Sequence, residues 1–173
     1  MVQANPTEPG PIRTLFSFPN PVNDVAARLV AAMVMVFSLV IIATGVWWLM
    51  IVLAYGFLAR VLTGPTLSPM GLLATRWLVP LLGRPTRPVP GPPKRFAQAV
   101  GLVFSVTALV RYLTLDSMTA SRVVLGVLTL FAALESGLGF CAGCYVFNQL
   151  MRLGLIPESV CREGLAVDTT MTR

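Results

Sequence analysis

The sequence predicts an all-α membrane protein, an antiparallel bundle of four transmembrane helices with a short interfacial helix between its two hairpins. Hydrophobic residues make up 55% of the 173 residues and charged residues only 12%. The mean hydropathy of +0.78 is far above the value usual for a soluble domain. Long apolar stretches, separated by short turns or by a basic loop, are each long enough to cross a bilayer.

The first two spans form a hairpin after a polar lead-in. Residues 1–21 are polar and rich in proline and lack the features of a signal peptide, so we expect a disordered segment. The stretch over 26–44 is apolar and long enough to cross a hydrocarbon core of about 30 Å. A second span is expected over 46–62, and it opens with Trp47 and Trp48, which suit a membrane interface.

The segment over 63–95 cannot cross a membrane, because it holds five Lys or Arg residues, no acid and eight prolines. Its apolar residues recur at helical spacing from Met70 to Leu81, which predicts a short helix lying in the interface. The proline-rich stretch that follows should be extended and stiff.

The second hairpin follows this loop. A span over 96–115 contains only two strongly polar residues, Gln98 and Arg111. The fourth span is expected over 123–150, which exceeds the roughly twenty residues that a crossing needs, so it should tilt or project into the interface. A tail of mixed charge follows over 152–173.

Charge asymmetry predicts the orientation. The long loop is strongly basic and the two other loops are short and nearly neutral, so the positive-inside rule places the long loop in the cytoplasm. Four crossings then put both termini in the cytoplasm. The same bias accounts for the net charge of +6, and no recognition helix or repeated basic and aromatic pattern is present, so we expect no nucleic-acid partner.

Four motifs resemble those of an uncharacterised bacterial family. They are FPNPVND at 18–24, GFLARVLTGP at 56–65, VPGPPKRFAQ at 89–98 and ALESGLGFCAGC at 133–144. The family is a domain of unknown function found in small integral membrane proteins, common in actinobacteria. The resemblance implies a four-helix protein of the bacterial plasma membrane and supplies no reaction. Members often carry a second close pair of cysteines in the tail, whereas this chain has Cys161 alone there.

Glu135 is an acid within a predicted span. Such a carboxylic acid costs about 3 kcal/mol on insertion scales, so it needs a cationic partner. Counting 1.5 Å per residue places Arg28, Arg60 and Glu135 within about 10 Å of the cytoplasmic face, and Arg111 about 14 Å from the level of Glu135. Arg28 and Arg60 are therefore the expected partners. The cluster either holds the helices in register or lines a polar cavity for an anion or a proton.

Cys141 and Cys144 form a CxxC pair, and on a helix their sulfurs would lie on one face. They predict a redox pair if they reach disulfide range and if a positive charge, or a helix N-terminus created by a break over 137–139, stabilises a thiolate. Close packing through a GxxxG motif that ends at Gly143 is the alternative. Metal binding is the interpretation with the least support, since Cys161 would bring the number of thiolates only to three and the chain has no His. We expect neither a metal nor a cofactor.

These residues lead to one functional hypothesis and one rival. In the first, Cys141 and Cys144 exchange electrons or sulfur with a soluble thioredoxin-like or sulfurtransferase partner at the cytoplasmic leaflet. In the rival, the protein is a non-enzymatic accessory, scaffold or transport subunit of a larger membrane complex, in which Glu135 and the arginines organise the bundle. The lipid bilayer is the expected surrounding in both. The substrate is not identified by the sequence.

Overall fold

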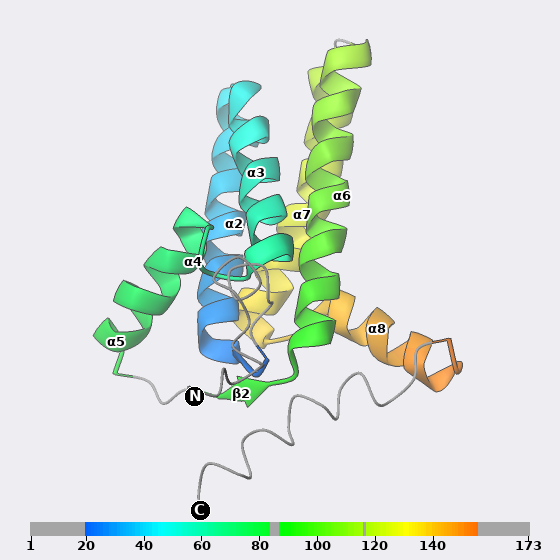
Figure 1. Cartoon of the computed structure of the whole chain (residues 1–173). Helices are drawn as coiled ribbons and strands as arrows, with labels where there is room; N and C mark the ends of the chain where they lie inside the picture. The colour runs from blue at the N-terminus through cyan, green and yellow to red at the C-terminus, as the bar shows by residue number, and fades with distance from the viewer. Residues whose placement is uncertain (1–19, 84–86, 116, 156–173) are drawn as a thin grey trace, which may run out of the picture.

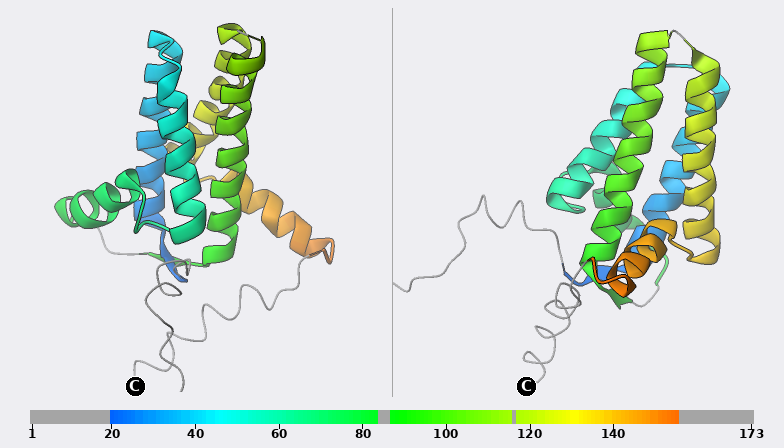
Figure 2. Two further views of the ribbon diagram at one scale, coloured as in Figure 1. Left: turned by 45° about the horizontal axis from the view of Figure 1, so that its top comes forward. Right: turned by 90° about the vertical axis from the view of Figure 1, so that its right-hand side faces the viewer.

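The computed structural model describes residues 20–83, 87–115 and 117–155, and apart from two short strands its regular elements are helical, as expected (Figure 1). Most of the predicted lead-in, Arg84, and the tail beyond residue 155 with Cys161 lie outside the described residues. Four longer helices stand side by side as a bundle (Figures 1 and 2). They are α2 (Asp24–Thr44), α3 (Trp48–Thr63), α6 (Gly91–Leu115) and α7 (Met118–Leu138).

The shorter elements lie around this bundle. The predicted helix over 70–81 is confirmed as three consecutive helical pieces that project from the side of the bundle (Figure 1). They are α4 (Pro69–Leu73), a π-helical turn (Ala74–Leu78) and α5 (Val79–Leu81). Strand β1 (Val22–Asn23) pairs antiparallel with β2 (Pro88–Val89). The proline-rich stretch over 84–93 was expected to be extended, and it is so at β2, but α6 already begins at Gly91.

A fourth apolar helix is present, as predicted, but its predicted bounds of 123–150 are wrong. Helix α7 ends at Leu138, and Gly139 adopts a left-handed conformation with φ of 70° and donates its amide to the carbonyl of Glu135. Glycine adopts this conformation without the steric cost that a Cβ brings, so it ends the helix here. After this turn a separate helix, α8 (Ala142–Arg152), points sideways from the end of the bundle (Figures 1 and 2).

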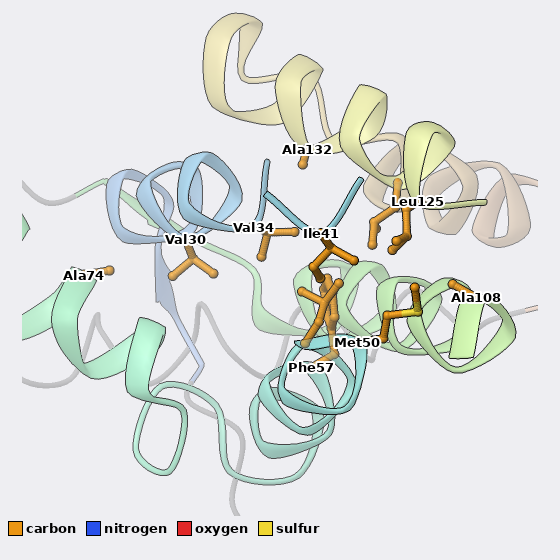
Figure 3. Packing of buried hydrophobic residues seen from close by; sticks show 11 residues of the cluster. Val30, Val34, Ile41, Met50, Phe57, Ala74, Ala108, Leu125 and Ala132 are labelled. Carbon is orange, nitrogen blue, oxygen red and sulfur yellow. The ribbon is translucent and has the colours of Figure 1, made fainter. Parts of the chain in front are cut away.

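A buried apolar cluster joins the four longer helices. Ile41 and Met50 have no exposed surface, and Ala108 and Leu125 face them from α6 and α7 (Figure 3). Helix α2 packs mainly on α7, α3 on α6, and α6 also on α7. These contacts place the beginnings of α2 and α6 beside the ends of α3 and α7, at the end of the bundle where α8 lies.

The outer surface of the bundle is apolar. Three helices, α2, α6 and α7, are long and apolar enough to cross a membrane, and α3 is apolar with 16 residues. Their outward-facing side chains are hydrophobic, as expected of a protein surrounded by lipid and unusual for one surrounded by water. They include Val36, Leu39, Ile51, Leu58, Val103, Val110, Val123 and Leu130.

Candidate functional site

Two motifs that are far apart in the sequence meet at one end of the bundle. Asn23 caps α2, because its Oδ1 accepts a hydrogen bond from the Val25 amide at 3.1 Å, and the same oxygen accepts one from the Arg87 amide at 3.3 Å. Asn20 Oδ1 accepts a hydrogen bond from the Gly91 amide at 2.9 Å. These side chains therefore tie the beginning of α2 to the beginning of α6.

Lys94 is the centre of the charge cluster. Its Nζ lies 2.9 Å from Oδ1 of Asp24 and 2.9 Å from Oε1 of Glu135, and only 9% of its side chain is exposed. The ammonium thus bridges α2, α6 and α7. The expectation that Arg28 or Arg60 pairs with Glu135 is wrong: Lys94 takes that place. The predicted loop over 63–95 includes Lys94, but α6 begins at Gly91, and proline in the first turn, as at Pro92 and Pro93, is typical of a helix start.

Arg28 binds the end of α7 instead. Its Nη2 donates a hydrogen bond to the carbonyl of Gly137 at 3.1 Å. Carbonyls in the last turn of a helix lack partners within the helix, and a cation there also interacts favourably with the helix dipole. Arg28 therefore secures the turn at which α7 stops.

Arg60 is buried, with 4% of its surface exposed, and its hydrogen-bond partners are neutral side chains. Its Nε donates to Oε1 of Gln98 at 2.8 Å, its Nη1 donates to Oγ of Ser68 at 3.2 Å, and the guanidinium lies 4.5 Å from the centre of the Phe57 ring. Its Nη2 has no hydrogen-bond partner among the described residues. Arg60 and Lys94 line a cavity of about 150 Å³. Arg60 therefore orients Gln98, and the direct ion pair with Glu135 is made by Lys94.

The CxxC pair lies at the N-terminus of α8. Cys141 is the N-cap residue, and its Sγ accepts a hydrogen bond from the backbone amide of Cys144 at 3.4 Å. Both cysteines are free thiols and partly buried. The helix break thus supplies the helix N-terminus that the redox interpretation of the sequence required, and a helix N-terminus stabilises a thiolate.

The two thiols differ in acidity. The hydrogen bond from the Cys144 thiol lowers the pKa of Cys141 below its ordinary value; Lys94 acts in the same direction, whereas burial and Glu135 oppose it. The same hydrogen bond raises the pKa of Cys144, and burial raises it further. The N-cap position and the Cys144 amide therefore favour a thiolate at Cys141 over one at Cys144.

A second and larger cavity, of about 330 Å³, adjoins the thiol pair. It lies among α2, α3, α6, α7 and the beginning of α8, and its lining is mostly apolar. Cys141, Glu135 and Gln98 are among the polar residues in its wall. Four phenylalanines also line it. They are Phe57, Phe96, Phe104 and Phe131.

In the described part of the chain, no three Cys, Asp or Glu side chains gather as a metal site would require.

The four sequence motifs converge in the structure. Each supplies a residue to this end of the bundle, namely Asp24, Arg60, Lys94 and Glu135. The last motif also supplies the two thiols.

Comparisons with known proteins bear on this convergence. No curated protein matches the chain, and no solved structure matches it. A family model described as a domain of unknown function, DUF4395, matches residues 22–152. That range covers more than half of the chain and contains the charge cluster and the CxxC pair. The chain therefore belongs to the DUF4395 family, and the expectation of an uncharacterised domain family is confirmed.

Proposed function

We propose that this protein is a membrane thiol–disulfide oxidoreductase that exchanges electrons with a soluble dithiol protein. The position of Cys141 carries the proposal, since its sulfur caps α8 and accepts a hydrogen bond from the Cys144 amide at 3.4 Å. A CxxC pair at a helix N-terminus favours a reactive first thiolate. Packing alone would require neither the cap nor the difference in acidity between the two thiols.

The reaction runs through a mixed disulfide. In the oxidised protein, a thiolate of the partner attacks Sγ of Cys144 or Cys141, and attack at Cys144 releases Cys141, the better leaving group because its pKa is the lower. The partner's second thiolate then attacks the partner sulfur of the mixed disulfide and releases Cys144, which takes up a proton. The partner loses two electrons and becomes a disulfide, and the cysteine pair gains them.

In the opposite direction, Cys141 starts the reaction. Its thiolate attacks a disulfide of the partner, forms a mixed disulfide and releases one partner thiolate. Cys144 then loses its proton and attacks Sγ of Cys141, which forms the Cys141–Cys144 disulfide and releases the second partner thiolate. The two cysteines thus have separate roles, nucleophile and resolving thiol.

The charge cluster supports the thiol chemistry indirectly. Glu135 lines the same cavity as Cys141, and its negative charge opposes formation of the thiolate. Lys94 lies 2.9 Å from Glu135 and offsets that charge. The ion pair therefore keeps the electrostatic field near Cys141 compatible with a thiolate.

The proposal includes four crossings and a cytoplasmic site. Helix α3 has 16 residues, which correspond to about 24 Å at 1.5 Å per residue, so it would cross a hydrocarbon core of about 30 Å only where the bilayer thins locally. The basic residues Arg87, Lys94 and Arg95 belong to the end of the bundle where α8 lies, and the positive-inside rule favours the cytoplasm for that end. A soluble cytoplasmic partner would then reach Cys141 without entering the membrane.

Trapping the mixed disulfide tests the proposal. The variant Cys144→Ser, purified in lipid nanodiscs, should form a stable mixed disulfide with glutathione at Cys141, because no resolving thiol is present. The wild-type chain should instead form the Cys141–Cys144 disulfide, and Cys141→Ser should form neither product at a comparable rate. Mass spectrometry of the alkylated protein distinguishes the three results. If no variant forms either disulfide and the double replacement by Ala is without effect in cells, the rival role of accessory subunit replaces this proposal.

A further inference from the structure

A thiol pair that oxidises a soluble dithiol must pass two electrons on before it can react again. The cavity of about 330 Å³ beside Cys141 offers a place for an electron acceptor. Its volume lies within the range of about 300–1,000 Å³ that is usual for small-molecule sites. Its mostly apolar lining suits an acceptor that dissolves in lipid.

We infer that this cavity binds the ring of a lipid-soluble quinone, which accepts the electrons of the Cys141–Cys144 dithiol. The inference rests on the proposed function and names its second substrate. Phenylalanine side chains from α3, α6 and α7 line the cavity and suit a flat, apolar ring. An acyl chain or a sterol would fill apolar space equally well, but neither would accept electrons from a thiol.

Gln98 provides a polar group for a quinone oxygen. Its Oε1 accepts a hydrogen bond from Arg60 Nε at 2.8 Å, which fixes the orientation of the amide. Gln98 lines the cavity, and Nε2 is the donor atom of its side-chain amide. A carbonyl oxygen of the quinone would accept that donor. The buried Arg60, which is 4% exposed, thereby holds the donor in place.

The electron transfer balances. The Cys141 thiolate adds to a ring carbon of the quinone, which forms a C–S bond and leaves negative charge on an oxygen that takes up one proton. Cys144 then loses its proton and attacks Sγ of Cys141, so that an S–S bond forms, the C–S bond breaks and its electron pair returns to the ring. A proton on the second oxygen completes the quinol. The dithiol has lost two electrons, and the quinone has gained two electrons and two protons.

A paired substitution on α8 tests the site. Val146 lines the cavity and is 47% exposed, so Val146→Trp should fill the cavity with little effect on folding. Asn148 is exposed on the same helix and does not line the cavity, so Asn148→Trp is the matched control. Val100→Phe, on α6, fills the cavity from another wall and keeps the test independent of α8.

The experiment uses the full chain in nanodiscs, reduced and freed of reductant, with decyl-ubiquinone as the probe. We expect one quinol and one Cys141–Cys144 disulfide per protein, measured by ultraviolet absorbance and by mass spectrometry. Val146→Trp and Val100→Phe should slow the reaction about tenfold or more, the factor that about 1.4 kcal/mol of lost binding produces, while Asn148→Trp matches the wild type. Reaction of all variants with glutathione disulfide should be equal.

Two results would overturn the inference. One is equal rates of quinone reduction for the cavity variants and for Asn148→Trp, which would make the reaction non-specific. The other is a wild-type protein that exchanges with glutathione disulfide and leaves the quinone oxidised. In both cases the reaction with glutathione disulfide tests the proposed function separately. The proposed function fails only if the protein does not react with glutathione disulfide either.

Discussion

Lys94 Nζ lies 2.9 Å from Oε1 of Glu135 and thereby joins the first turn of α6 to the last turn of α7. The same ammonium lies 2.9 Å from Asp24 at the beginning of α2. One buried cation thus compensates two acids on two other helices, a few residues before the turn that carries the thiol pair. The predictions below follow from this arrangement and from the position of Cys141.

Replacing Lys94 should destabilise the fold strongly. Lys94→Met leaves Asp24 and Glu135 without their cation in a mostly buried setting, and removal of one partner from a buried pair costs about 3 kcal/mol. Glu135→Gln should lower the free energy of unfolding by less, because Lys94 still pairs with Asp24. Arg111→Met, an exposed change on the same helix, should lie within about 0.5 kcal/mol of the wild type. Chemical unfolding in detergent measures the series, and equal stability of Lys94→Met and Arg111→Met would contradict the cluster.

Gly139 should tolerate a side chain poorly. Its φ is +70°, and a Cβ would lie 3.0 Å from Cζ of Arg28. Gly139→Ala should therefore combine about 1–2 kcal/mol of left-handed backbone strain with a contact that displaces Arg28. Gly154→Ala is the matched control, because its φ is +73° and a Cβ would meet nothing within 4 Å. Thermal unfolding should rank Gly139→Ala below Gly154→Ala, and the reverse order would disprove the role of Arg28 at this turn.

The acidity of Cys141 predicts how its alkylation depends on pH. The thiolate is the reactive form, and the pKa of Cys141 is lowered, so the midpoint of its reaction with iodoacetamide should fall below the ordinary thiol value of about 8.5. Cys144→Ala removes the thiol hydrogen bond and should move the midpoint upward. Cys144→Ser retains a hydroxyl donor and should lie between the two. A wild-type midpoint at or above that of Cys144→Ala would show that the hydrogen bond does not stabilise the thiolate.

Gly143 permits the close approach of α8 to α6. A Cβ at Gly143 would lie 2.6 Å from the Cα and the Cβ of Ala97, so Gly143→Ala must push the two helices apart. We expect faster alkylation of Cys144, because its surroundings open, and weaker protection of the Cys144 amide in hydrogen exchange. Gly126→Ala is the control, since a Cβ there meets nothing within 4 Å. Unchanged reactivity of Cys144 in Gly143→Ala would mean that this contact does not shape the site.

The orientation can be tested through the one cysteine of the tail. In a chain with Cys141 and Cys144 replaced by Ala, Cys161 is the remaining thiol. A maleimide that cannot cross membranes should label Cys161 in inside-out vesicles and leave it unlabelled in intact cells, because the positive-inside rule favours a cytoplasmic tail. Labelling from outside would reverse the orientation and would move the thiol pair to the opposite face.

Composition and local spacing were sufficient for the helical class and for most helix positions. The spans expected over 26–44, 46–62 and 96–115 correspond to α2, α3 and α6, because an apolar stretch bounded by caps and turns is a local property of the chain. The CxxC pair and the four motifs were also visible in the sequence. The end of α7 was predictable only in principle, since Gly137 and Gly139 indicated a break without deciding that one occurs.

The tertiary structure decided which charges and thiols meet. Counting residues along each helix gives the depth of a side chain in the membrane, but neither the rotation nor the tilt of the helix. By depth alone, Arg28 and Arg60 were suitable partners for Glu135. Lys94 reaches Glu135 because α6 begins at Gly91 and packs beside α7. The cavity beside Cys141 depends on five helices at once. Packing between segments far apart in the sequence creates the ion pair and the cavity. No single stretch of sequence determines these contacts.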